Sequence, residues 1–182
     1  MMKKILLIVF VLAVSINGYS QSYFTDSGTA VFHSKVPLHT FSGTSENLTG
    51  LIDLENGTVD FYLDLETLDT GNAKRDKDMK LTLETEKFPF GEFFGKITSE
   101  FDAASNEAQD VTVEGVFKIH GKEQNINVNG QITLDGNQLK LTAGWILKLE
   151  DYEIKPPSLL FIKVDQEQEI ELSAVLTIKE DS

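Results

Sequence analysis

Few side chains in this sequence have the chemistry of a catalytic or metal-binding site. The chain contains three histidines, His33, His39 and His120, and no cysteine, so most of the usual zinc and copper ligands are missing. His33 and His39 are six residues apart and would share one face of a strand, but Pro37 interrupts that strand. We therefore expect no metal site. His120 precedes a glycine and is expected to be a hydrogen-bonded turn residue.

Two pairs of carboxylates are the remaining candidates for acid–base chemistry, Asp64 with Glu66 and Glu150 with Asp151. Each pair falls on an expected solvent-facing strand surface or loop, where a carboxylate is ionised at neutral pH and makes a poor general acid. The sequence contains no Gly-x-Ser-x-Gly, P-loop or dinucleotide-binding fingerprint. We expect no catalytic residues and no cofactor, and we expect that the protein is not an enzyme.

Apolar residues recur at every second position through much of the sequence, and this period is typical of β-strands. In the clearest run, six apolar residues alternate with mostly polar ones: Leu139, Leu141, Ala143, Trp145, Leu147 and Leu149. Residues 59–65 and 170–178 repeat the pattern. Each such strand has one apolar and one mostly polar face, so we expect an all-β fold in which an antiparallel sheet curls round an apolar interior.

Turn signals divide the chain into about eight strands. Asn56-Gly57 is the strongest hairpin signal, and His120-Gly121-Lys122 and Asp135-Gly136-Asn137 mark two further turns. Gly91 and Gly95 lie within one strand and indicate bends in a barrel wall. We expect strands at 28–38, 48–54, 58–68, 90–101, 111–119, 124–134, 139–149 and 170–178, and the longest irregular stretch at 151–168.

One segment, Asn72 to Glu86, departs from the strand period and predicts a short amphipathic helix. Asn72 can cap its first turn, and Phe88-Pro89 ends it. Lys74 with Asp78 and Asp76 with Lys80 are spaced as i, i+4 ion pairs. Met79 and Leu83 form a narrow apolar stripe. We expect this helix to cross the surface or to cover one end of the barrel.

The first twenty residues have the pattern of a signal peptide, which predicts a periplasmic or secreted protein. Lys3 and Lys4 precede a short apolar run, and Gly18 and Ser20 provide small residues before a cleavage site at Gln21. Residues 21–182 then form one domain with 14 basic and 29 acidic residues, a formal charge of −15. Such a surface repels nucleic acids and anionic membranes. We expect no nucleic-acid partner and no membrane insertion after removal of the leader.

Several motifs give the chain a resemblance to the YceI-like family of exported bacterial proteins. The matching segments are Gly50-Leu51-Ile52-Asp53, Leu68-Asp69-Thr70-Gly71-Asn72 with Arg75-Asp76, Lys87-Phe88-Pro89, Phe117-Lys118-Ile119-His120-Gly121-Lys122 and Leu149-Glu150-Asp151-Tyr152-Glu153-Ile154. The resemblance extends over nearly all of residues 24 to 178. It implies a lipocalin-like, eight-stranded antiparallel β-barrel. It also implies an apolar tunnel that holds a long isoprenoid, such as an isoprenoid quinone, or another amphiphilic lipid.

The alternation and the resemblance together predict which side chains line that interior. Seven are expected on inward strand faces, namely Phe61, Leu63, Phe93, Phe117, Leu141, Trp145 and Leu147, and Met79 and Leu83 are expected to close one end. The expected function is to sequester or carry a lipid. The alternative is a barrel filled by its own side chains. Such a protein would be an envelope or secreted interaction module that binds protein or glycan through loops such as 151–168.

Overall fold

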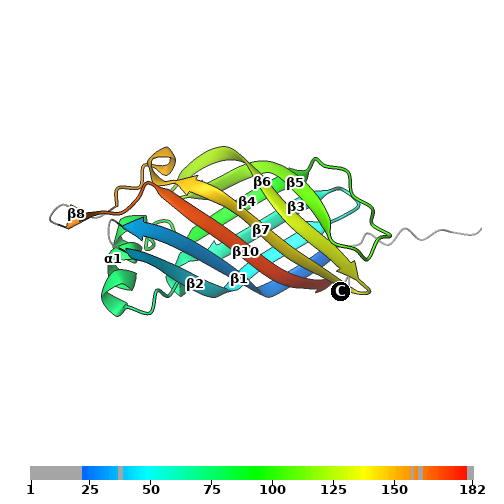
Figure 1. Cartoon of the computed structure of the whole chain (residues 1–182), viewed down its shortest axis with the longest axis horizontal. Helices are drawn as coiled ribbons and strands as arrows, with labels where there is room; N and C mark the ends of the chain where they lie inside the picture. Colours follow the sequence, from blue (N-terminus) through cyan, green and yellow to red (C-terminus); the bar gives the residue numbers. More distant parts are fainter. Residues whose placement is uncertain (1–21, 37–38, 157, 160–161, 180–182) are drawn as a thin grey trace, which may run out of the picture.

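Eight antiparallel strands close into a barrel in the computed structural model, which describes residues 22–36, 39–156, 158–159 and 162–179 (Figure 1). The strands are β1 (Ser22–Val36), β2 (His39–Asp53), β3 (Thr58–Asp64), β4 (Phe90–Ile97), β5 (Gln109–Ile119), β6 (Lys122–Asp135), β7 (Gln138–Lys148) and β10 (Glu167–Ile178). Their order round the barrel is β1-β10-β7-β6-β5-β4-β3-β2. The predicted eight-stranded antiparallel fold is confirmed. The predicted leader lies outside the described residues.

The first strand begins earlier than predicted. The sequence pattern missed its first residues because the pairing of this strand is irregular. Register shifts between Thr25 and Gly28 and between Gly28 and Ala30 interrupt the pairing with β2. Tyr23 and Thr25 are buried before the irregularity, and Gly28 and Ala30 are buried after it. A bulge changes which residues face inward, so the strand no longer has a single two-residue period. The sequence pattern therefore revealed only the part of β1 that follows the bulge.

The third strand ends four residues before the predicted boundary. Residues Leu65–Thr67 form a 3₁₀ helix instead of continuing β3. Asp64 caps this helix, because its carboxylate accepts a hydrogen bond of 2.9 Å from the backbone N–H of Glu66. Leu65 and Leu68 are nevertheless buried. The predicted extension of the strand to Leu68 is wrong.

The predicted hairpin turns are present. Gly57, Gly121 and Gly136 all have positive φ angles, which glycine adopts without steric cost. In the turn between β2 and β3, the Asp53 carboxylate accepts hydrogen bonds from the backbone N–H groups of Glu55 and Asn56. A short hairpin that was not predicted, β8 (Ser158–Leu159) with β9 (Ile162–Lys163), lies in the stretch expected to be irregular. The stretch starts with a second 3₁₀ helix, Leu149–Tyr152.

The helix predicted between Asn72 and Glu86 is α1 (Ala73–Leu83), which lies at one end of the barrel (Figure 1). Asn72 is its N-cap and accepts hydrogen bonds from the backbone N–H groups of Lys74 and Arg75, as expected. Lys74 pairs with Asp78 at 2.7 Å. The predicted pair of Asp76 with Lys80 is wrong, since each side chain has a partner outside the helix. Across the part of the chain that the structure describes, no helix is long and apolar enough to cross a membrane.

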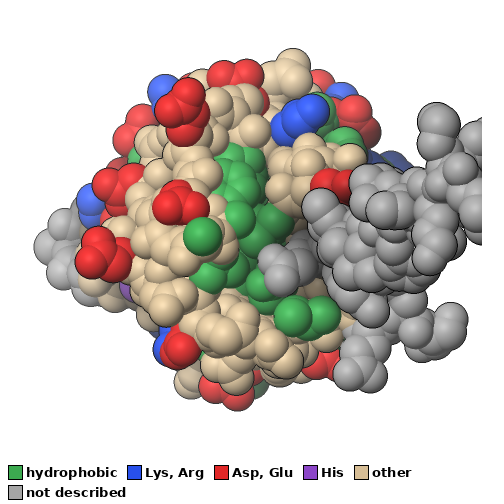
Figure 2. All heavy atoms as spheres, turned by 90° about the vertical axis from the view of Figure 1, so that its right-hand side faces the viewer, with side chains coloured by type: hydrophobic (Ala, Val, Ile, Leu, Met, Phe, Trp, Pro, Cys, Tyr) green, Lys and Arg blue, Asp and Glu red, His purple; other side chains and the backbone are tan. Residues whose placement is uncertain are grey.

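The barrel interior differs between its two halves. The half away from α1 is filled by a packed cluster: Tyr23, Leu48, Ile52, Val59, Phe61, Val111, Ile132, Leu134, Leu139, Leu141, Ala174 and Leu176. Figure 2 faces this end, where a strip of apolar side chains lies between polar and acidic ones. A second cluster lies in the half near α1: Leu65, Leu68, Phe117, Ile119, Leu147, Leu149, Tyr152 and Ile154. These side chains line the barrel wall and do not fill its centre.

Candidate binding cavity

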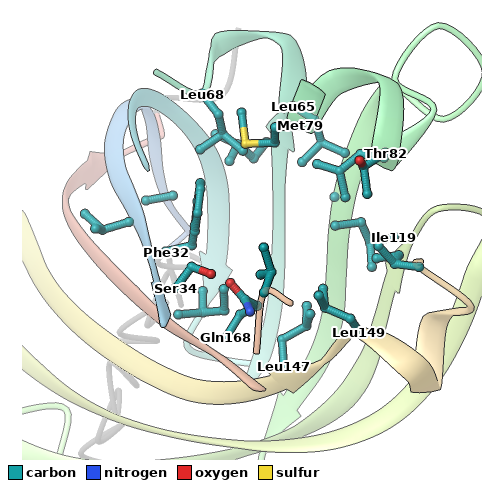
Figure 3. A pocket seen from close by; sticks show the side chains of 18 of the residues that line it. Phe32, Ser34, Leu65, Leu68, Met79, Thr82, Ile119, Leu147, Leu149 and Gln168 are labelled. Carbon is teal, nitrogen blue, oxygen red and sulfur yellow. The ribbon is translucent and has the colours of Figure 1, made fainter. Parts of the chain in front are cut away.

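The half of the barrel beneath α1 contains a cavity of about 430 Å³ (Figure 3). Pockets of about 300 to 1,000 Å³ bury most of a drug-sized ligand, so this space is large enough for a small molecule or a lipid segment. Its lining is almost wholly apolar. The contributors that Figure 3 labels are Phe32, Ser34, Leu65, Leu68, Met79, Thr82, Ile119, Leu147, Leu149 and Gln168.

Eight of the nine predicted lining residues border this cavity. They are Phe61, Leu63, Met79, Leu83, Phe93, Phe117, Trp145 and Leu147. The ninth, Leu141, faces inward but lies in the filled half, where it is paired with Ile132 of β6 and Ala174 of β10. Leu141 is therefore not among the residues that border this cavity. Alternation identifies the inward face of a strand, but it does not give the height of a residue along the barrel axis.

Several lining residues were missed by the sequence reading. Phe32, Ile119 and Leu149 lie on predicted strands with the right alternation, so the pattern contained a signal for them. Leu65 begins a 3₁₀ helix and Leu68 is its C-cap, and the pattern did not distinguish this segment from a strand. Ser34 and Gln168 were also missed, because a polar residue carries no sign that it faces an apolar interior. All of these residues border the cavity.

The Leu68–Asp76 motif joins α1 to the barrel rim. The backbone of Asp69 forms an isolated β-bridge with Thr44 of β2, with N···O distances of 2.9 and 3.0 Å. The Asp76 carboxylate accepts hydrogen bonds from the hydroxyl of Thr70 at 2.6 Å and from its backbone N–H at 2.9 Å. These bonds hold the pKa of Asp76 below its usual range. The Arg75 guanidinium lies 4.4 Å from the ring centre of Phe41, a cation–π contact.

A second group of polar contacts holds the other end of α1. The Lys80 ammonium lies 3.0 Å from the carboxylate of Glu66, which belongs to the 3₁₀ helix after β3. The same carboxylate accepts a hydrogen bond from the Thr85 hydroxyl. The hydrogen bond from Thr85 lowers the pKa of Glu66 most, and the contact with Lys80 lowers it further. No residue of α1 is fully buried. Met79 and Leu83 are partly buried against the second cluster, so the helix covers the cavity as a lid.

Two glycines allow aromatic rings to lie flat against the cavity wall. A Cβ atom added at Gly50 would lie 2.0 Å from the ring of Phe61, and one at Gly43 would lie 2.3 Å from the ring of Phe32. Real Cβ atoms do not approach that closely, so any larger residue there would push these rings away from the wall. The rings of Phe32 and Phe61 both border the cavity. The glycines therefore help to keep the space open.

A histidine holds the part of the wall beside Glu84, the C-cap of α1, whose carboxylate lies 3.6 Å from His120 Nε2. The Nδ1–H of His120 donates to the backbone carbonyl of Tyr152 at 3.0 Å, which confirms the expected hydrogen-bonded turn histidine. The ring of Phe117 packs edge-on against both Tyr152 and Trp145, with centroids 5.7 and 5.3 Å apart. Burial, with a smaller effect of the Asp151 charge, raises the pKa of Tyr152 to about 12. The His120-Gly121 and Asp151-Tyr152 motifs therefore meet in one structural contact.

The candidate acid–base residues do not come together in the cavity. Asp64 caps a 3₁₀ helix, Glu66 is bound by Lys80 and Thr85, and Glu150 and Asp151 are exposed. Among the described residues, Asp78 is the one carboxylate that borders the cavity, and it pairs with Lys74. Within the same residues no group of three or more histidines and carboxylates is arranged to hold a metal ion. The side chain of His39 is outside the described part.

Comparisons with known proteins agree with this architecture. A polyisoprenoid binding domain from Saccharophagus degradans superposes with a TM-score of 0.74 at 15% identity, covering 88% of this chain and 100% of that domain. BcnA from Burkholderia cenocepacia gives a TM-score of 0.66 at 16% identity, with 82% and 96% covered. The YCEI protein of Campylobacter jejuni gives 0.53 at 13% identity, with 99% and 92% covered.

At these identities the solved structures establish the fold alone. No curated protein sequence matches the chain. The sequence profile of the YceI-like domain, in contrast, matches residues 22–176, which is nearly the whole of the described barrel. The chain belongs to the YceI-like family.

Proposed function

We propose that this protein sequesters or carries an apolar lipid, of the isoprenoid class, in the barrel cavity, and that it does so without catalysis. The observation that carries the proposal is the apolar space of about 430 Å³ beneath α1. Binding in such a cavity needs no constellation of charged groups, since burial of apolar surface provides the driving force. The name of one structural neighbour, a polyisoprenoid binding domain, supports the same ligand class.

The size of the cavity sets the length of chain that it can hold. At roughly 30 Å³ per heavy atom, the share that a water molecule has in the liquid, a fifteen-carbon chain needs about 450 Å³. The cavity volume is of the same order.

Burial gives enough free energy for such binding. Removal of about 500 Å² of apolar ligand surface from water contributes about 12 kcal/mol before the costs of immobilisation. The lid supports exchange of the ligand, because α1 is held by polar contacts at the rim and has no fully buried residue. We further propose that the protein is exported, on the basis of the leader pattern in residues 1–20.

Saturable binding of a neutral fluorescent probe tests the proposal. N-phenyl-1-naphthylamine is titrated into the purified protein, and farnesol, which has fifteen carbons, is then added to displace it. We expect one saturable site per chain and full displacement by farnesol. Hexane-1,6-diol, which is short and polar at both ends, serves as the control and should not displace the probe. Probe fluorescence that rises linearly without saturation would contradict the proposal.

A further inference from the structure

The cavity contains polar atoms that have no partner within the described part of the protein. Two buried side-chain atoms there lack any hydrogen bond, Ser34 Oγ and Trp145 Nε1. Both residues border the cavity. Ser34 is 1% exposed, and a buried hydroxyl without a partner is costly and uncommon in folded proteins. Such an atom indicates a group that is supplied from outside the chain.

Gln168 places an acceptor beside this hydroxyl. Its amide N–H₂ donates to the backbone carbonyls of Asp165 at 2.7 Å and Glu167 at 3.2 Å. A flipped amide would put its oxygen against those two carbonyl oxygens, so the orientation is fixed. The carbonyl oxygen of Gln168 receives no hydrogen bond from any described residue. Gln168 is buried and borders the cavity.

Ser34 and Gln168 lie next to each other on the cavity wall. The antiparallel pairing of β1 with β10 ends with His33 opposite Glu169, and Ser34 and Gln168 are the next residues along the two strands. In Figure 3 the side-chain oxygen atoms of both residues point towards the interior. This part of the wall is near the end of β1 that reaches the α1 rim. The apolar chain of a lipid whose head group lies there would extend towards Phe61 and Phe93, which also border the cavity.

A hydroxyl group matches this pair of polar atoms. Its O–H can donate to the carbonyl oxygen of Gln168, while its oxygen accepts from Ser34 Oγ. A carboxylate or phosphate would instead face the Gln168 oxygen without a cation and would lose its hydration in an apolar space. Among the described residues, two cations border the cavity, and both have partners, since Lys74 pairs with Asp78 and Arg75 lies over the Phe41 ring.

We propose that the cavity selects a neutral lipid alcohol, with its hydroxyl between Ser34 and Gln168 and its apolar chain directed into the barrel. This inference rests on the proposed lipid-binding function and names the chemical class of the ligand. Ser34 and Gln168 are then the residues that determine specificity. The remaining lining residues supply apolar contact that does not distinguish one head group from another.

Displacement of N-phenyl-1-naphthylamine by three matched lipids tests the inference. Farnesol carries the hydroxyl, farnesene is the hydrocarbon of the same length, and farnesyl phosphate carries the anion. The variants are Ser34→Ala, which removes the donor, and Ser34→Thr, which retains it. Ser173→Ala is the matched control, because Ser173 is exposed on β10. The affinity of the probe for each variant is measured first.

We expect Ser34→Ala to weaken farnesol binding roughly tenfold, the effect of about one hydrogen bond to a buried group. Farnesene binding is expected to stay within twofold in the same variant. Ser34→Thr and Ser173→Ala should retain the farnesol affinity of the natural sequence, and farnesyl phosphate should bind less tightly than farnesol.

Two results would overturn the inference and leave lipid binding standing: an equal effect of Ser34→Ala on farnesol and farnesene, or tighter binding of farnesyl phosphate. Failure of all three lipids to displace the probe would instead overturn the proposed function.

Discussion

Filling part of the cavity from its wall should weaken lipid binding strongly without unfolding the barrel. Gly91 on β4 borders the cavity, and a Cβ atom added there would meet nothing closer than Leu65 Cδ2 at 3.6 Å. Gly91 is not among the glycines with positive φ, so a larger residue can adopt its backbone conformation. Gly91→Leu is therefore expected to project an isobutyl group into the space that the ligand occupies.

The size of the effect follows from the atoms that are displaced. The four side-chain carbons of leucine occupy about 120 Å³ at roughly 30 Å³ each, more than a quarter of the 430 Å³ cavity. If a ligand loses burial of four methylene groups at about 0.8 kcal/mol each, it loses about 3 kcal/mol. That loss corresponds to roughly a hundredfold weaker binding. Stability should not fall, because glycine within a strand is itself destabilising by about 0.5 to 1 kcal/mol.

Probe titration and thermal melting together measure both expectations. Lys96→Leu is the matched control, since it adds the same side chain at an exposed position of the same strand. The control should bind the probe as the natural sequence does. Gly91→Leu could have a melting temperature at or above that of the natural sequence and still bind the probe with unchanged affinity. In that case the ligand does not occupy this cavity and the reasoning is refuted.

Three further predictions concern the wall and the lid. Gly50→Ala is expected to destabilise the barrel by about 1 to 3 kcal/mol, because it forces the Phe61 ring off the wall; denaturant unfolding measures this, and an unchanged midpoint would show that the ring moves freely. Asp76 has a lowered pKa, so its contribution to stability is present above about pH 4, the ordinary value for aspartate, and is lost as the pH falls through the lowered folded-state value. The melting temperature of Asp76→Asn should therefore be below that of the natural sequence at pH 7, and the gap should shrink below pH 4; a gap independent of pH would contradict the assignment. Tyr152 has a raised pKa of about 12, so its contribution is complete below about pH 10 and is lost as the pH rises through about 12. Tyr152→Phe should make stability less sensitive to pH in that window, and an identical alkaline transition in both proteins would exclude this role.

The sequence predicted the fold well because most strands alternate without interruption. β7 pairs with β10 over eleven consecutive positions with no register shift, and its inward residues could be read directly from the sequence. The helix was also predictable, since Asn72 is a local cap that acts within one turn. Local signals and a regular period are enough for these elements.

The remaining features depend on tertiary structure. The bulges in β1 shift the inward face, and no local signal showed where they lie. Leu141 and Leu147 share a face and a pattern, but one packs in the filled half and the other borders the cavity. Asp76 and Lys80 have the spacing of an ion pair, yet Thr70 and Glu66 offer closer partners. Height along the axis and competition between partners are properties of the closed barrel.

Mass spectrometry of bound lipid tests the central claim most directly. The full-length chain is produced in bacteria and recovered without detergent, and organic extracts of the purified protein are compared with extracts of Gly91→Leu and Lys96→Leu. We expect an apolar lipid close to one per chain in the natural sequence and in Lys96→Leu, and a strongly reduced amount in Gly91→Leu. Equal lipid in all three proteins, or none above background in any of them, would contradict a lipid-binding cavity beneath α1.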